Sequence, residues 1–113
     1  MKNLTHTKEE ILQRAEEFRA ALQEYIVNQQ KQNSPVLVDL YKTQILLKNG
    51  TKNIKVIRKD TQSIVHCFID LATGNILKAA SWKVPANGVR GNIFDDNYGI
   101  GTAVTEYGAA YFR

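Results

Sequence analysis

Residues 63 to 82 read SIVHCFIDLATGNILKAASW, and this stretch predicts two antiparallel strands joined by a short turn. Runs rich in β-branched and aromatic residues flank Ala72-Thr73-Gly74. This triplet suits a three-residue hairpin loop, in which Gly74 takes the left-handed conformation that glycine adopts without steric cost. Such a loop places Leu71 opposite Asn75, and the register of both strands follows from that pair.

This register predicts two unlike faces, because side chains alternate across a strand. One face is apolar and suits a core: Val65, Cys67, Ile69, Leu71, Leu77 and Ala79. The other mixes aromatic and basic groups: Ile64, His66, Phe68, Lys78, Ala80 and Trp82. Such a mixture is typical of platforms for single-stranded nucleic acid, since every base has a π-face and every phosphate a charge. The alternative is that Tyr107, Tyr111 and Phe112, or a second subunit, cover this face and make Trp82 a core residue.

The residues before this hairpin predict a second one. Asn49-Gly50 between two β-rich runs is typical of a two-residue hairpin turn, with strands near residues 43–48 and 53–59. Residues 35–41 are ambiguous, because Ser34 and Pro35 could cap a short helix while Val36, Val38 and Leu40 alternate as in a strand. We favour an extended segment.

A long helix is predicted over residues 7–32. Thr7 and Glu10 form a capping box, and the following run contains no Gly or Pro. An apolar seam follows helical spacing: Ile11, Ala15, Phe18, Leu22 and Tyr25. A helix of this size is about 36 Å long and exceeds the expected body of the domain. The seam could therefore also join subunits, and we expect a homo-oligomer.

Together these elements predict one α+β domain over residues 1–113. A long N-terminal helix packs on a small antiparallel sheet of about four strands, in two hairpins, within residues 35–82. Residues 83–113 form an irregular, loop-rich segment. Hydrophobic residues make up 43% of the chain and charged residues 23%, which is typical of a globular protein. The chain shows neither a membrane-spanning run nor a secretory signal, and its one cysteine, Cys67, favours a reducing setting. We expect a cytoplasmic protein that does not enter a membrane.

The positive charge lies in the middle of the chain. Residues 7–33 contain four Lys or Arg against five Glu, a balance of −1, whereas residues 42–90 contain nine Lys or Arg against two Asp, a balance of +7. This asymmetry favours a polyanionic partner, although a solvated charged face without a partner is as common.

Residues 82–92 are the main candidate ligand site. Pro85 and two glycines predict a shaped turn rather than a strand. Arg90 can donate two hydrogen bonds to a phosphate, or it can pair with Asp95 or Asp96; both readings stay open. The candidate residues for a phosphate and a base are Trp82, Lys83, Asn87, Gly88, Arg90, Gly91 and Asn92. A secondary surface consists of His66, Phe68, Lys78, Lys52, Lys55, Arg58 and Lys59.

No catalytic residue, metal site or cofactor is predicted. His66 and Cys67 are adjacent without the spacing of a metal motif, and the other histidine is His6. Asp95 and Asp96 are typical of a turn or a helix start. An enzyme is therefore the function class that we favour least.

The last 50 or so residues resemble a group of small proteins of tailed bacteriophages. In that group a strand-turn-strand leads into a KAASWK.PA...RGNI.D segment, and the chain ends near YGAAY.R. The matching positions are Asp70, Thr73, Gly74, Lys78, Ala79, Ala80, Ser81, Trp82, Lys83, Pro85, Ala86, Arg90, Gly91, Asn92, Ile93, Asp95, Tyr107, Gly108, Ala109, Ala110, Tyr111 and Arg113. Members of the group carry no assigned activity. The resemblance implies a viral source and an infected bacterial cytoplasm, and no catalytic role.

These observations favour a non-enzymatic phage accessory protein that binds a phosphate-bearing ligand, with single-stranded nucleic acid first. One alternative is an anti-defence protein that sequesters a small phosphorylated nucleotide used as an immune signal. Another is a virion or host-interaction protein without an anionic ligand.

Overall fold

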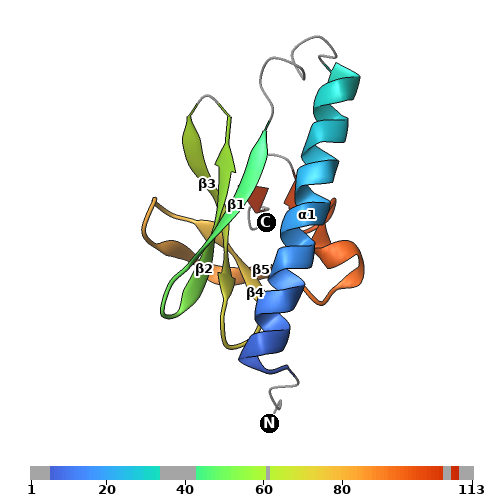
Figure 1. The fold of residues 1–113 in the computed structure, drawn as a ribbon. Coiled ribbons are helices and arrows are strands. Elements are labelled where there is room, and N and C mark those ends of the chain that lie inside the picture. The colour runs from blue at the N-terminus through green and yellow to red at the C-terminus, as the bar shows by residue number, and fades with distance from the viewer. Residues whose placement is uncertain (1–5, 34–42, 61, 106–107, 110–113) are drawn as a thin grey trace.

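A computed structural model describes residues 6–33, 43–60, 62–105 and 108–109. One long helix, α1 (Lys8–Asn33), packs across a five-stranded antiparallel sheet (Figure 1). The strands follow one another in space in the order β1-β2-β3-β4-β5. They are β1 (Gln44–Asn49), β2 (Asn53–Lys59), β3 (Ser63–Asp70), β4 (Asn75–Ala79) and β5 (Pro85–Asn92). A 3-10 helix, η1 (Asp96–Gly99), and a small hairpin of β6 (Val104–Thr105) and β7 (Gly108–Ala109) follow. The predicted α+β class is confirmed.

Helix α1 begins at the predicted capping box. The Thr7 N–H donates to Glu10 Oε1 at 2.7 Å, and the Glu10 N–H donates to Thr7 Oγ1 at 3.1 Å. These two bonds satisfy donors that the first helical turn leaves without an intrahelical partner. The helix therefore starts where the sequence predicts.

Replacing Thr7 with Ala is expected to lower the free energy of unfolding by about 1 kcal/mol, because the Glu10 N–H loses its acceptor. Urea unfolding of the wild type, Thr7→Ala and Thr7→Ser measures the effect. Thr7→Ser keeps the hydroxyl and is expected to stay close to the wild type. Equal losses in both variants would contradict a capping role.

The apolar seam of α1 faces the sheet. Ile11, Ala15, Phe18 and Leu22 are buried, and Tyr25 is partly buried against the same core. The sheet contributes Ile45, Ile54, Val56, Cys67, Ile69 and Ile76 to this core. Since the chain itself covers the seam, the structure does not support the predicted subunit contact through it.

Helix α1 also protects the edge strand β1. The Ile45 N–H donates to Gln23 Oε1 at 3.0 Å, and Arg19 donates to the Ile45 carbonyl at 3.3 Å. Free backbone groups on an edge strand are templates for aggregation. Side chains of the helix satisfy two of these groups.

The β1–β2 hairpin has the predicted strands but a longer turn. Asn49 pairs with Ile54, and the Gly50 N–H donates to the Asn53 carbonyl at 2.9 Å. Four residues therefore connect the paired positions, and the predicted two-residue turn is wrong. This longer connection places Lys48 directly opposite Lys55.

The predicted register of the next hairpin is wrong by one residue. Ile69 pairs with Ile76 and Phe68 with Leu77, because the Gly74 N–H donates to the Asp70 carbonyl at 2.8 Å and lengthens the loop. Gly74 does have the predicted positive φ, 80°. A one-residue slip moves each side chain to the other face. Ile76 is therefore in the core, and Leu77 lies on the outer face of the sheet with Phe68.

A bulge in β3 buries His66, which we had predicted on the outer face. Val56 pairs with Cys67 and Ile57 pairs with Val65, so His66 is the extra residue. Both His66 and Cys67 are buried. Bulges reorient side chains in this way, and this one removes His66 from the predicted stacking platform.

Residues 85–92 form strand β5 rather than the predicted irregular turn. Only the Ala80–Val84 connection turns, and Ser81 Oγ closes it by accepting from the Lys83 and Val84 N–H groups. Pro85 is tolerated because it is the first residue of a strand at the sheet edge. The region beyond β5 is packed as well, since Ile93, Ile100 and Val104 are buried in the core. The predicted segment 35–41 and residues Tyr107, Tyr111 and Phe112 lie outside the described residues.

Candidate functional site

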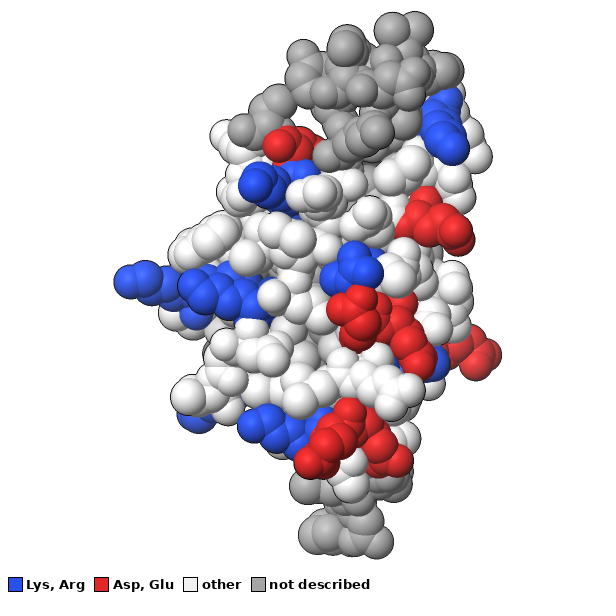
Figure 2. All heavy atoms as spheres, viewed as in Figure 1, with Lys and Arg blue, Asp and Glu red and all other residues white. Residues whose placement is uncertain are grey.

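The outer face of the sheet, opposite α1, carries a row of side chains that crosses all five strands. The register aligns Lys48, Lys55, Phe68, Leu77 and Val89. Figure 2 shows that Lys and Arg gather on the sheet side of the molecule, while Asp and Glu lie mainly over α1. The basic charge predicted for the middle of the chain is thus concentrated on this side.

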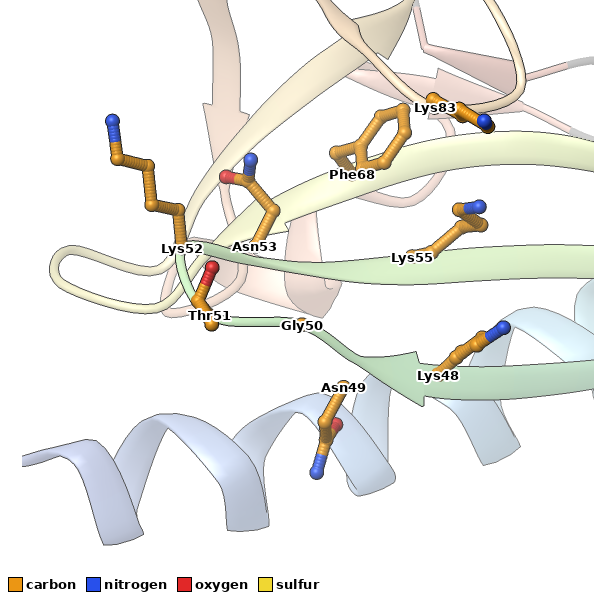
Figure 3. Close-up of a pocket in the computed structure, with 9 residues that line it drawn as sticks. All are labelled: Lys48, Asn49, Gly50, Thr51, Lys52, Asn53, Lys55, Phe68 and Lys83. Carbon is orange, nitrogen blue, oxygen red and sulfur yellow. The ribbon is translucent and has the colours of Figure 1, made fainter.

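A hollow of about 330 Å³ lies on this face at the β1–β2 turn (Figure 3). Four lysines line it, together with Phe68 and polar residues of the turn: Lys48, Lys52, Lys55, Lys83, Asn49, Gly50, Thr51 and Asn53. None of these lining residues is acidic. Two like charges directly opposite on neighbouring strands destabilise a sheet, so the Lys48–Lys55 pair carries a cost that a bound anion would relieve.

Trp82 lies beside this hollow, in the turn between β4 and β5. The Lys55 Nζ is 4.4 Å from the centroid of its indole ring. Trp82 is 44% exposed, so it is not a core residue, whereas Phe68 is 3% exposed. The hollow therefore combines four ammonium groups with one accessible aromatic ring.

Residues 1–109 match a family model described as "Family of unknown function (DUF7717)". The chain belongs to this family. No curated protein and no solved structure matches the chain. Among the described residues of this DUF7717 protein, no helix is long and apolar enough to cross a membrane.

The structure divides the main candidate site, residues 82–92, into two parts. In the DUF7717 protein Lys83 lines the hollow, and Trp82 lies beside it, next to Lys55. Arg90 donates to the carbonyls of Asn87 and Gly88 at 3.0 and 2.8 Å, within its own strand. These bonds occupy carbonyl groups of the edge strand β5.

Asn92 and Gly91 also have structural roles. The Asn92 Nδ2 donates to the Thr73 carbonyl at 3.0 Å and to Asn75 Oδ1 at 2.9 Å, which joins two turns. A Cβ at Gly91 would lie 2.4 Å from the Ala103 Cβ, so the close packing of the C-terminal segment requires glycine there. Asp95 Oδ2 accepts from the Asn92 N–H at 3.0 Å, in the turn role that we expected. The predicted convergence of Trp82 with Arg90 and Asn92 on one ligand is not supported.

The secondary surface is divided as well. Lys52, Lys55 and Phe68 line the hollow. Arg58 forms an ion pair with Asp60, with Nε and Oδ2 3.0 Å apart, and Lys59 is exposed near the far end of the same strand. Neither Arg58, Lys59 nor Lys78 lines the hollow. Lys48 is not among the predicted site residues, because a two-residue turn would place it opposite Thr51 instead of Lys55.

His66 and Cys67 form a buried pair without access to a substrate. His66 Nε2 lies 2.6 Å from the Thr105 carbonyl oxygen, and Nδ1 lies 3.3 Å from Cys67 Sγ. Burial lowers the pKa of His66 to about 4, and burial raises the pKa of the Cys67 thiol far above its ordinary value. A neutral thiol in the core is a poor nucleophile. Within the described part of the DUF7717 chain, no group of three His, Cys, Asp or Glu side chains could hold a metal.

Proposed function

We propose that this DUF7717 protein is a non-enzymatic accessory protein that binds a phosphate-bearing ligand, single-stranded nucleic acid, on the outer face of its sheet. The observation that carries the proposal is the cross-strand Lys48–Lys55 pair within a hollow lined by four lysines. A phosphate between these ammonium groups replaces repulsion with two attractive contacts. Following the phage resemblance, the proposed setting is the cytoplasm of an infected bacterium.

The kinds of side chain at the hollow favour a sequence-independent nucleic-acid ligand. Lysine acts on a phosphate as a point charge. Arginine, with its planar guanidinium group, is preferred where a ligand is recognised by two parallel hydrogen bonds. Binders of single strands combine such a positive groove with exposed aromatic rings. Lys83 and Trp82 are neighbours in the β4–β5 turn; Lys83 supplies a positive charge and Trp82 an exposed aromatic residue.

A second hollow favours a strand over a single nucleotide. It has a volume of about 620 Å³, and it shares Thr51, Lys52 and Asn53 with the first hollow. Its other lining residues are Lys8, Asp70, Leu71, Ala72 and Leu77. The two hollows therefore meet at the β1–β2 turn. A mononucleotide would fill one of them, while a strand of several nucleotides can follow both.

Binding of a fluorescent 15-nucleotide deoxythymidine oligonucleotide, measured by anisotropy at several salt concentrations, tests the proposal. Four lysine–phosphate contacts are expected to give a slope of about −2 to −3 in log K against log salt, since each contact to a single strand contributes about −0.7. Competition with duplex DNA, ATP and a cyclic dinucleotide defines the ligand class. Lack of oligonucleotide binding at low salt would remove the proposal. Competition by a nucleotide at matching affinity would favour the sequestering protein instead.

A further inference from the structure

We infer that the Trp82 indole is a base-stacking surface that Lys55 covers in the free protein, and that a base of the ligand takes the place of the Lys55 ammonium group. This inference rests on the proposed function and names how its ligand is held. Figure 3 shows Lys55 among the residues of the hollow, and its Nζ lies over the Trp82 ring at 4.4 Å. The Lys55 side chain thus lines the hollow, and its ammonium group also contacts the Trp82 ring.

Hydrogen bonds fix the backbone of the turn that carries Trp82. The Ala80 and Ser81 N–H groups both donate to the Val84 carbonyl, at 3.0 and 3.1 Å. Ser81 Oγ in turn accepts from the Lys83 and Val84 N–H groups, at 3.3 and 3.2 Å. With the backbone fixed on both sides, the exposed indole is presented to a ligand with little ordering to be done on binding.

Among the described residues, Trp82 is the aromatic residue beside the hollow that a base can reach. Phe68 lines the hollow and lies in the same cross-strand row as Lys55, but it is only 3% exposed. Trp82 as a residue is 44% exposed, so part of it is open to a flat ring. Stacking in this hollow therefore depends on Trp82.

The cation–π contact of Lys55 favours exchange over permanent pairing. At exposed sites a cation over an aromatic ring is held weakly, and base stacking on such a ring is generally stronger. A phosphate in the hollow attracts the ammonium group of Lys55, which already faces Lys48 across the strands. Movement of Lys55 toward the phosphate would leave the face of the indole open to the neighbouring base.

The test uses the fluorescence of Trp82, which is the only tryptophan in the chain. Unlabelled deoxythymidine 15-mer and an abasic oligonucleotide of equal length are titrated separately. We expect saturable quenching by the 15-mer and an affinity about tenfold or more above that of the abasic strand. Trp82→Ala is expected to remove this preference, so that the affinities of the variant for the two strands become equal. Val84→Ala, in the same turn at a side chain that is 55% exposed, is the matched control.

The outcomes separate this inference from the proposed function. Equal affinities for the two strands without a change in Trp82 emission would overturn the stacking role and leave phosphate binding standing. Binding of neither strand would remove the proposed function itself. Lys55→Met tests the exchange: the preference for the 15-mer over the abasic strand is expected to increase by about twofold or more, because the base no longer displaces an ammonium group from the ring. An unchanged or smaller preference in Lys55→Met would show that the base does not displace Lys55, and would overturn the exchange.

Discussion

The double variant Lys48→Glu, Lys55→Glu is expected to bind the deoxythymidine 15-mer at least about a hundredfold more weakly than the wild type at low salt. The two substitutions change the charge of the hollow by four, from the ammonium groups of four lysines to two lysines and two glutamates. The ligand then meets carboxylates at the place where the phosphate is proposed to lie. Anisotropy titrations at about 50 mM and 200 mM salt measure the loss and the accompanying decrease in the salt slope.

The same variant provides its own stability control. Replacing two opposed lysines with two opposed glutamates keeps a like-charge pair at the Lys48–Lys55 positions, so the cost to the sheet is similar. A second double variant, Lys31→Glu, Lys59→Glu, changes the net charge equally at exposed positions that do not line the hollow. This control variant is expected to bind the 15-mer only about threefold more weakly than the wild type, because its changed charges lie away from the hollow. An equal loss in both double variants would show that overall charge, and not the hollow, determines binding.

The elements that the sequence predicts well are those fixed by local interactions. Thr7 and Glu10 are three residues apart, so the capping box can be recognised without knowledge of the rest of the fold. The buried seam of α1 follows helical spacing in the same way. The strands near 43–48 and 53–59 are close to the observed Gln44–Asn49 and Asn53–Lys59. Each of these features depends on neighbours within a few residues.

Registers and bulges depend on individual backbone hydrogen bonds that the sequence pattern does not reveal. The hydrogen bond from the Gly74 N–H to the Asp70 carbonyl moves the β3–β4 register by one residue. The bulge at His66 changes which side chains of β3 point to each face of the sheet. Strand β5 was missed because its glycines and Pro85 are typical of turns, yet an edge strand tolerates them.

The candidate site shows the same division. Trp82 and Lys83 were predicted as ligand residues; Lys83 lines the hollow and Trp82 lies beside it. Their partners Lys48 and Lys55 come from the other hairpin, and only the observed registers bring them to one place. Arg90 was predicted either to hold the phosphate or to pair with Asp95 or Asp96, but its Nη1 donates to the nearby carbonyls of Asn87 and Gly88. Residue type alone does not separate a ligand contact from a backbone contact.

The stability of the protein is expected to fall as the pH decreases from about 6.5 to about 4, and His66 is expected to account for about 3 kcal/mol of that fall. Burial is the main cause of the lowered pKa of His66, and the nearby Arg58 charge acts in the same direction. The hydrogen bond to the Thr105 carbonyl opposes the decrease in pKa but does not cancel it. The neutral ring also ties β3 to the β6–β7 hairpin, where a Cβ at Gly108 would lie 2.9 Å from the His66 carbonyl oxygen.

The sign of this effect follows from proton binding in the two states. Between pH 6.5 and pH 4 the imidazole of the unfolded chain takes up a proton, while His66 in the folded chain stays neutral, so protons stabilise the unfolded state. Urea unfolding at pH 7.5, 5.5 and 4.5, compared between the wild type and His66→Gln, isolates the contribution, because all other groups titrate in both proteins. The variant is expected to be less stable at pH 7.5, and the difference is expected to shrink steadily toward pH 4.5. A difference that stays constant with pH would show that the His66 ring does not resist protonation in the folded protein.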